Sequence, residues 1–219
     1  MDESKSSFST IIIISVVAGI ILLIIAAVAL KGPEEKVTLP VKVEEFSDFQ
    51  CPACKSYYPV IKNVIAEFTD AEITFVYKHY PLQSVHHNAY KAAIGAEAAR
   101  EQNKFTEFHD LLFEKQDDFS PKEVTLNDEM LLGYVQELQM DLEKFQADLA
   151  KSEIQARVDA DIAEGKSRNV TATPTFFVNG KIVIFKDTDD VEQKLRTVIK
   201  EKVALAKKQL AESQNSSQN

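Results

Sequence analysis

The feature that most constrains the fold is the only pair of cysteines, Cys51 and Cys54, which are separated by two residues at the end of an apolar stretch. This stretch, Val37 to Phe49, is rich in Val and Phe and predicts a β-strand, and a helix is expected from Cys51 to about Phe68. The arrangement places one sulfur at a helix N-terminus, where backbone N–H groups and the helix dipole favour a thiolate. We therefore expect redox chemistry at this pair.

Composition argues against two other functions, metal binding and nucleic-acid binding. A structural zinc site needs more soft ligands than two cysteines supply, and the spacing of the histidines does not provide them. We expect no metal site and no cofactor. The net charge of -9, without a basic stretch interleaved with aromatic residues, makes nucleic acid an unsuitable partner.

The first thirty residues contain a candidate membrane span. Residues 11–30 form an uncharged apolar run, which at about 1.5 Å per residue matches the roughly 30 Å hydrocarbon thickness of a bilayer. Residues 1–10 are then a short N-terminal flank. The run exceeds the usual apolar region of a signal peptide, so we predict a transmembrane signal-anchor. The alternative is a cleaved signal peptide, because Ala27, Val28 and Ala29 have the small-x-small form of a cleavage site.

We expect the folded domain to lie outside the cytoplasm. The flanking charges mildly favour the opposite topology, since Lys5 precedes the span and Lys31, Lys36 and Lys42 follow it. Long domains, however, translocate with little regard to charge. The sequence thus predicts a single-pass protein of the cell membrane, with a polar linker at residues 31–36 and an extracytoplasmic domain.

Beyond the linker, the apolar pattern predicts one α/β domain over residues 37–200. A second strand is expected from Ala71 to Tyr80, and the strand-helix-strand order implies a parallel pair. Residues 86–166 have helical periodicity. Within them, Ser120 to Glu123 has the form of a capping box, and Asn127 could equally cap the helix that follows.

The last quarter of the chain returns to strands and ends in a helix. A strand from Thr175 to Val178 followed by Asn179-Gly180 predicts a type I′ hairpin. An amphipathic helix is expected to open at Asp189. Residues 201–219 are expected to contain the end of this helix and a disordered tail from Ser213.

This order of elements resembles the thioredoxin-fold family, and in particular its DsbA-like branch. The helical block decides the branch, because plain thioredoxins join their halves by a short segment. The resemblance implies a thioredoxin fold with an inserted helical subdomain at about 86–166. Many relatives have Gly-Val-x-Gly where this chain has Asn169 to Ala172, and Asn169 still fits because Asn tolerates positive φ. Three stretches carry the resemblance to membrane-anchored and Gram-positive members: Val43 to Cys51, Asn88 to Ala93, and Thr173 to Gly180.

The two cysteines are the expected catalytic pair. Cys51, first in the helix, should be the exposed nucleophile with a lowered pKa, and Cys54 should lie deeper and close the disulfide. The alternative is a static disulfide, which is disfavoured because so small a loop hardly restricts the unfolded chain. Pro52 and Ala53 separate the cysteines, and the histidine that the enterobacterial enzyme has between its cysteines is missing.

The resemblance also implies roles for Thr173 and Pro174. Pro174 resembles the family's cis-proline, which lies against the cysteine pair and leaves the backbone of Thr173 free to pair with an extended substrate. The alternative is a proline that merely starts an edge strand. Thr173, together with Pro52 and Ala53, is therefore expected to contact substrates.

Glu45 is a candidate proton carrier. It lies six residues before Cys51 and, by alternation, shares a face with valines of the strand, which predicts a carboxyl group buried beneath the cysteines. Burial raises the pKa of a Glu and lets it exchange protons near neutral pH. The alternative is a structural Glu with an ionic or water partner. Asp48 and His79 are expected to be surface residues near the site.

The resulting hypothesis is a membrane-anchored thiol-disulfide oxidoreductase that oxidises cysteine pairs in exported proteins. The resemblance implies reoxidation by a quinone-linked membrane protein of the DsbB or vitamin K epoxide reductase type. The alternatives are a disulfide isomerase or reductase of the same fold and a non-catalytic peptide-binding module.

Overall fold

The structure is a computed structural model that describes residues 35–186 and 189–216. The chain divides into two compact units, Met1–Lys36 and Val37–Asn219. The predicted membrane span, residues 11–30, lies outside the described residues and stays a prediction. Of the helices in the described part of the chain, none combines the length and apolar character that crossing a bilayer requires.

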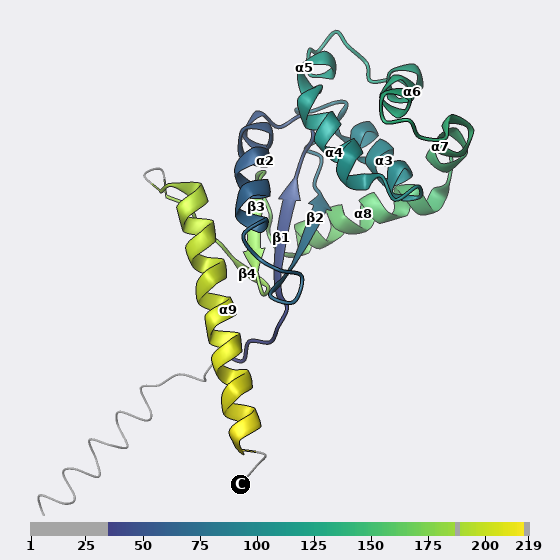
Figure 1. Cartoon of the computed structure of the whole chain (residues 1–219). Helices are drawn as coiled ribbons and strands as arrows, with labels where there is room; N and C mark the ends of the chain where they lie inside the picture. Colours follow the sequence, from purple (N-terminus) through teal and green to yellow (C-terminus); the bar gives the residue numbers. More distant parts are fainter. Residues whose placement is uncertain (1–34, 187–188, 217–219) are drawn as a thin grey trace, which may run out of the picture. The chain divides into compact units, whose positions relative to one another are not determined.

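A four-stranded sheet lies at the centre of the described part of the second unit, with the strand order β2-β1-β3-β4 (Figure 1). Strand β1 pairs in parallel with β2 and antiparallel with β3, and β4 continues antiparallel to β3. The predicted parallel pair is confirmed. The strands are β1 (Val41–Ser47), β2 (Ile73–His79), β3 (Thr175–Val178) and β4 (Lys181–Ile182).

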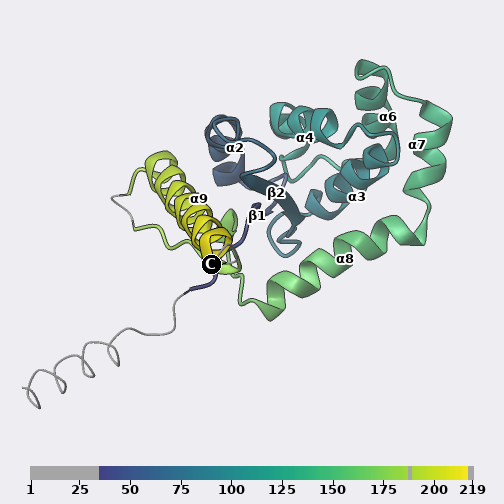
Figure 2. The ribbon, with the colours of Figure 1, turned by 60° about the horizontal axis from the view of Figure 1, so that its bottom comes forward.

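Most of the helices are inserted between β2 and β3, and the last of these also packs against the sheet, whereas the first and last described helices lie outside the insertion (Figures 1 and 2). In the described residues the helices are α2 (Pro52–Ile65), α3 (Ala89–Arg100), α4 (Phe105–Glu114), α5 (Gln116–Phe119), α6 (Asp128–Glu137), α7 (Leu142–Leu149), α8 (Ser152–Ser167) and α9 (Val191–Ser216). The predicted helical insertion is confirmed.

Helices cover both faces of the sheet because side chains alternate along β1. Val41 and Val43 point to one face and share a core with residues of α2 and α9. Phe46 points to the other face, toward α8. A Cβ atom on Gly165 of α8 would lie 2.5 Å from the ring of Tyr80, so glycine lets this helix approach the sheet closely.

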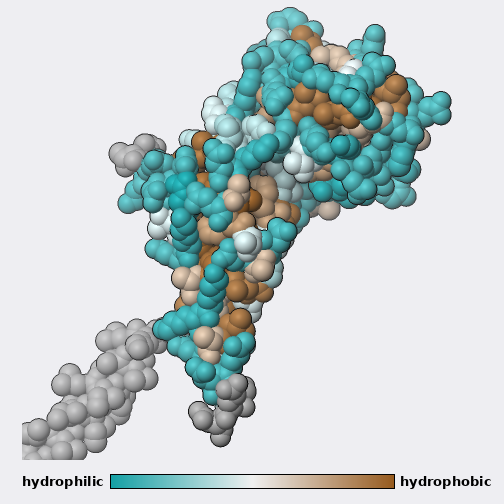
Figure 3. Space-filling model, in the orientation of Figure 1, coloured by the Kyte–Doolittle hydropathy of each residue, from teal (hydrophilic) through white to brown (hydrophobic). Residues whose placement is uncertain are grey.

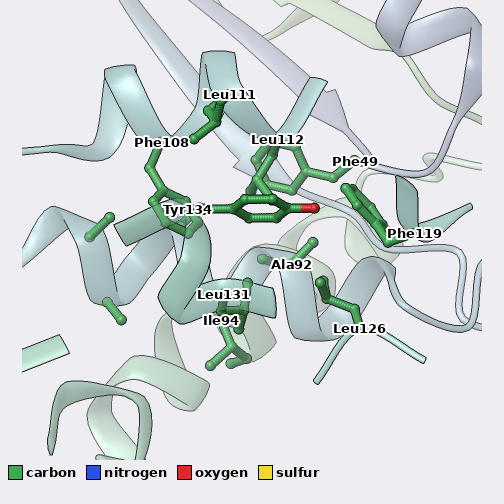
Figure 4. Packing of buried hydrophobic residues seen from close by; sticks show 14 of the residues in the cluster. Phe49, Ala92, Ile94, Phe108, Leu111, Leu112, Phe119, Leu126, Leu131 and Tyr134 are labelled. Atoms are coloured by element: carbon green, nitrogen blue, oxygen red, sulfur yellow. The ribbon is translucent and has the colours of Figure 1, made fainter. Parts of the chain in front are cut away.

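The insertion has its own hydrophobic core. Helix α3 packs against α4, α7 and α8, and its alanines, such as Ala92, allow the close approach. Phe108, Leu112 and Leu131 are fully buried between the surrounding helices (Figure 4). Phe49, which precedes the cysteines, belongs to this same core. The insertion is therefore packed directly against the segment that leads into the thiol pair.

The structure decides between the two predicted helix caps in the insertion. Asn127 caps α6, because its side chain accepts a hydrogen bond from the backbone N–H of Met130 at 2.9 Å. The capping-box prediction at Ser120 is wrong. The chain instead makes a turn there, in which the N–H of Val124 donates to the carbonyl of Pro121 at 3.0 Å.

Two predicted element boundaries differ from those in the structure, and one predicted turn is confirmed. Strand β1 starts at Val41 and not at Val37, because Pro40 has no N–H to give to the sheet. Helix α9 continues to Ser216, so the prediction of disorder from Ser213 is wrong for the described residues. The type I′ hairpin is confirmed, since both residues of the Asn179-Gly180 turn have positive φ, 48° and 76°.

The surface is mostly polar, with apolar areas on the insertion and beside α9 (Figure 3). Strand β4 forms one edge of the sheet, and Ile182 is 47% exposed there. This edge strand is only two residues long. A short edge offers few free backbone groups for pairing with another chain.

Candidate active site

Cys51 is the N-cap of α2, and Pro52 is its first helical residue. Both cysteines are free thiols. Cys51 retains 7% of its surface exposed and Cys54 none, so the prediction of an openly exposed Cys51 is wrong in degree although the order of depth is as expected. Pro52 and Ala53, which separate the two buried cysteines, are exposed.

The surroundings of Cys51 favour its thiolate. A hydrogen bond from the Cys54 thiol lowers the pKa of Cys51 to about 5, and burial opposes this only in part. The Thr173 side chain and the backbone N–H groups of Cys54 and Ala53 act in the same direction. The Cys54 thiol thus lowers the pKa of Cys51 most, and the backbone N–H groups at the helix N-terminus add the contribution that the sequence predicted.

Cys54 has the opposite character. Burial raises the pKa of its thiol well above the ordinary value, and the neighbouring Cys51 raises it further. Near neutral pH the reduced pair is thus a thiolate at Cys51 and a thiol at Cys54. Only one of the two sulfurs is ready to act as a nucleophile.

The loop before β3 brings Thr173 and Pro174 to the cysteines. The Thr173–Pro174 peptide bond is cis, and the Cys51 sulfur lies 3.3 Å from the Thr173 carbonyl oxygen, to which the protonated thiol donates a hydrogen bond. Cys51 and Thr173 are 122 positions apart in the chain. Asn169, at the start of this loop, has a φ of 58°, which is the positive value expected for it.

Glu45 is buried on the α2 side of the sheet, as predicted, and is 4% exposed. Its partners across the sheet are Tyr77 on β2 and Phe176 on β3. Burial raises the pKa of Glu45 to about 7, and the nearby Ser47 side chain offsets only part of this. The carboxyl group is close enough to Cys54 to raise the pKa of that thiol.

A cavity of about 580 Å³ connects Glu45 with the outside between α2, α4 and β2. Tyr77 and His109 also line this cavity, and the centroids of their rings lie 4.7 Å apart. Burial lowers the pKa of His109, although Asp110 opposes this. No sequence signal points to His109 as a site residue, because it lies in an ordinary amphipathic helix far from the cysteines in the chain.

Asp48 and His79 are not surface residues, so that prediction is wrong. Each is 1% exposed. Asp48 accepts hydrogen bonds from the N–H groups of Gln50 at 2.7 Å and Leu82 at 2.8 Å, and it contacts His86 Nδ1 at 2.8 Å. Asp48 therefore ties the loop before Cys51 to the loop after β2.

A further buried side chain, which no sequence motif marks, contacts the cysteine segment. Gln116, the first residue of α5, is 3% exposed. Its Nε2 donates to the carbonyls of Phe49 at 2.8 Å and of Cys51 at 3.1 Å. A lone Gln in a polar helical stretch carries no periodic signal that could have revealed this contact.

The sequence from residue 38 to residue 201 matches the model of the family described as thioredoxin. The chain belongs to the thioredoxin family. The matched segment includes both cysteines, Glu45 and Pro174. It also includes the whole helical insertion, which agrees with the DsbA-like branch expected from the sequence.

Solved structures with a similar fold support that branch. BdbD from Bacillus subtilis, in its oxidised form, is 24% identical with a TM-score of 0.63, over 79% of this chain and 91% of that chain. A thioredoxin-like oxidoreductase from Silicibacter pomeroyi is 25% identical with a TM-score of 0.57, over 73% and 87%. MdbA, a thiol-disulfide oxidoreductase from Corynebacterium diphtheriae, is 17% identical with a TM-score of 0.59, over 80% and 86%. The DsbA-like fold is thereby confirmed.

Curated proteins that match the chain are much longer than it. The chain is 38% identical over 151 residues to the Na(+)/H(+) antiporter NhaA 3 of Salinispora tropica. It is 39% identical over 151 residues to the Na(+)/H(+) antiporter NhaA 1 of Salinispora arenicola. In both cases the match covers 69% of this chain and 21% of the relative. These names describe whole proteins of which the chain spans about a fifth.

Proposed function

We propose that this DsbA-like protein is a thiol-disulfide oxidoreductase that oxidises cysteine pairs in exported proteins. The observation that carries the proposal is the setting of Cys51, at the N-cap of α2 and 3.3 Å from the Thr173 carbonyl, with a pKa lowered to about 5. A low pKa at Cys51 stabilises the reduced pair and makes Cys51 a good leaving group when the mixed disulfide is resolved, so a substrate reduces the disulfide readily. This favours an oxidase over a reductase.

In the proposed reaction, a substrate thiolate attacks the Cys51 sulfur of the Cys51–Cys54 disulfide. The disulfide breaks, its electron pair goes to the Cys54 sulfur, and a mixed disulfide forms between substrate and Cys51. A second substrate thiolate then attacks the substrate sulfur and releases Cys51 as a thiolate. The substrate loses two electrons and gains a disulfide, and the protein leaves as the reduced pair.

Glu45 donates the proton that Cys54 takes up in this reaction. The thiolate that leaves on Cys54 is buried and has a strongly raised pKa, so it needs a proton. Glu45, with a pKa of about 7, is partly protonated at neutral pH and lies near that sulfur. The cavity between α2 and α4 gives Glu45 a path to exchange the proton with solvent.

Substrate binding uses the loop around Pro174. The backbone of Thr173 lies beside the Cys51 sulfur, and it can pair with an extended substrate segment whatever the substrate's side chains. Pro52 and Ala53 are exposed next to the sulfur and add a small apolar contact. Backbone pairing of this kind suits an enzyme with many substrates.

The proposal includes anchoring to the cell membrane by residues 11–30, with the domain on the extracytoplasmic side and a quinone-linked membrane protein as reoxidant. Fractionation of cells that produce the full chain should place it in the membrane, where protease added from outside reaches the domain. Deletion of residues 11–30 should release the domain from the membrane or leave it inside the cell. Recovery of the full chain in the cytosol would contradict the anchor.

A trapping experiment tests the activity. In a Cys54→Ala variant the Cys51 thiolate can still attack the disulfide of an oxidised partner, the reverse of the last step, and displace one partner thiolate. The mixed disulfide is then not resolved by Cys54, so bound partners should accumulate and can be identified by mass spectrometry. Exported polypeptides in the trap would support the oxidase. A Cys51→Ser, Cys54→Ala variant is the control and should trap nothing. An empty trap on the single variant would count against thiol exchange.

Two measurements separate the alternatives. A disulfide more oxidising than that of thioredoxin, whose potential is about -270 mV, supports the oxidase, whereas a value near it would indicate a reductase or isomerase. Replacement of Cys51 by Ser should abolish oxidation of a reduced test protein. A peptide-binding module would keep its function in that variant.

A further inference from the structure

The helical insertion contacts the backbone of the redox segment through a buried amide. Gln116 at the start of α5 donates from one nitrogen, Nε2, to the carbonyls of Phe49 and Cys51, at 2.8 Å and 3.1 Å. The Cys51 carbonyl also accepts the N–H of Lys55 at 3.1 Å, as the first turn of α2 requires. Two donors from different parts of the fold therefore meet at the carbonyl of the residue that carries the reactive sulfur.

A second pair of amides fixes the position of α5 itself. Gln50 Nε2 donates to the carbonyl of Phe119, the last residue of α5, at 3.0 Å. Asn88 Nδ2 donates to the same carbonyl at 2.7 Å, and the Asn88 N–H donates to Gln50 Oε1 at 2.5 Å. Gln50, Asn88 and Gln116 are each less than 5% exposed. Hydrogen bonds thus hold both ends of α5 to the cysteine segment. Figure 1 shows α5 near the start of α2.

These contacts act on the Cys51 sulfur through its backbone. The sulfur contacts the Thr173 carbonyl on one side, and the Cys51 N–H donates to the Asp48 carbonyl at 3.1 Å on another. The Gln116 amide adds a third contact, because it donates to the carbonyls of Phe49 and Cys51 on either side of Gln50. Its N–H dipole also offsets the partial negative charge of the Cys51 carbonyl, which would otherwise oppose a thiolate on the same residue.

We propose that Gln116 is a positioning residue for thiol-disulfide exchange, through which the helical insertion holds the Cys51 backbone in the conformation that presents its sulfur beside Thr173. The inference rests on the proposed thiol exchange and adds a role for the insertion to it. Loss of the amide leaves two buried carbonyls with fewer donors and lets the segment relax. The expected consequence is a less acidic Cys51 and a slower exchange.

The test compares Gln116→Met with a matched control, Gln102→Met. Gln102 also makes two side-chain hydrogen bonds to backbone, both with Asp141, at 2.9 Å, and it is not part of the cysteine segment. The readouts are the pH titration of the Cys51 thiolate by its ultraviolet absorbance and the equilibrium constant with glutathione. Gln116→Met should shift the equilibrium by about fivefold toward the disulfide, which corresponds to about 1 kcal/mol, and raise the midpoint of the titration. Gln102→Met should change neither.

Gln116→Glu gives an independent answer if Gln116→Met does not fold. It keeps the shape of Gln116 and, when protonated, one donor. Its exchange rate should approach that of the wild type in acid and fall below it by at least about fivefold at neutral pH, where a carboxylate faces the two carbonyls. Wild-type titration and glutathione equilibrium in either folded variant would overturn the inference. If the wild type itself exchanges no thiols, the proposed function fails, and that result is distinct from an unaffected variant.

Discussion

At the scale of residues, two neighbouring carboxyl groups on β1 have opposite surroundings. Glu45 faces the buried side beneath the cysteines, where burial raises its pKa to about 7. Glu44 faces the other side, and although burial raises its pKa, hydrogen bonds from Arg168 and Lys42 hold it below the usual value. The alternation of a strand thus gives adjacent residues of one type different chemistry.

Glu45→Gln should make the protein more stable at high pH and much less so in acid. Between the usual pKa of 4.5 and about 7, the folded protein holds a proton on Glu45 that the unfolded chain has lost, so stability falls as pH rises through this range. At about 1.4 kcal/mol for each pH unit, the cost of the buried charge above pH 7 is on the order of 3 kcal/mol. Urea unfolding of both proteins at about pH 5 and pH 8 measures it.

Glu44→Gln is the control for that measurement. Glu44 is charged in both the folded and the unfolded protein over this range, so its replacement should destabilise the protein by the same amount at both pH values. An effect of Glu45→Gln that does not change with pH would show that Glu45 is not protonated near neutral pH.

The sequence predicted the site residues that carry a local signal and missed those that act from a distance. Cys51 and Cys54 are visible in their spacing, and Glu45 follows from the alternation of the strand. Gln116 and His109 contact this site only because the insertion folds back on it, and neither has a motif of its own. The depth of Asp48 depends in the same way on the loop after β2, which no local pattern predicts.

At the scale of elements, α8 approaches the sheet closely at Gly165. Gly165 faces the ring of Tyr80, and Tyr80 in turn donates a hydrogen bond to the Val170 carbonyl at 2.7 Å, in the loop that leads to Pro174. The position of α8 is therefore linked to the loop beside Cys51. The sequence predicted α8 by its periodicity, but the distance between helix and sheet was not predictable from it.

Gly165→Ala should destabilise the protein by about 1 to 3 kcal/mol, because the new methyl group overlaps the Tyr80 ring and the helix must move away. The midpoint of denaturant unfolding measures this change. Gly133→Ala is the matched control in α6, where a Cβ atom meets nothing within 4 Å. It should stabilise by roughly 0.5 to 1 kcal/mol, as expected for alanine in an exposed helix. Equal effects of the two substitutions would contradict a tight contact at Gly165.

Element boundaries were predicted well where a turn residue marks them and less well where packing sets them. Asn179-Gly180 fixes the hairpin by its own backbone preferences. The end of α9 depends instead on a buried stripe that continues through Val203 and Ala206, and on Gln209, which accepts the Val37 N–H at 2.8 Å. A contact between the two ends of the domain has no local signature in either.

At the scale of the whole molecule, the acidity of Cys51 is part of the stability of the reduced protein. Its pKa of about 5 in the fold lies below the ordinary 9.0, so between these values the unfolded chain binds a proton that the folded protein does not, and stability rises with pH. From about pH 7 to pH 8.5 the reduced protein should gain on the order of 1 kcal/mol relative to Cys51→Ser, after allowance for solvent screening. Chemical unfolding under reducing conditions measures it. A constant difference between the two proteins would contradict the low pKa.

The complete burial of Cys54 limits how other proteins can exchange thiols with the pair. Intermolecular thiol-disulfide exchange can occur only at the sulfur of Cys51. A protein that reduces the pair and a protein that oxidises it must therefore both contact this one sulfur. In the proposed cycle a client polypeptide and a reoxidising partner would therefore bind in turn and never together, so an excess of either one would slow the cycle by excluding the other.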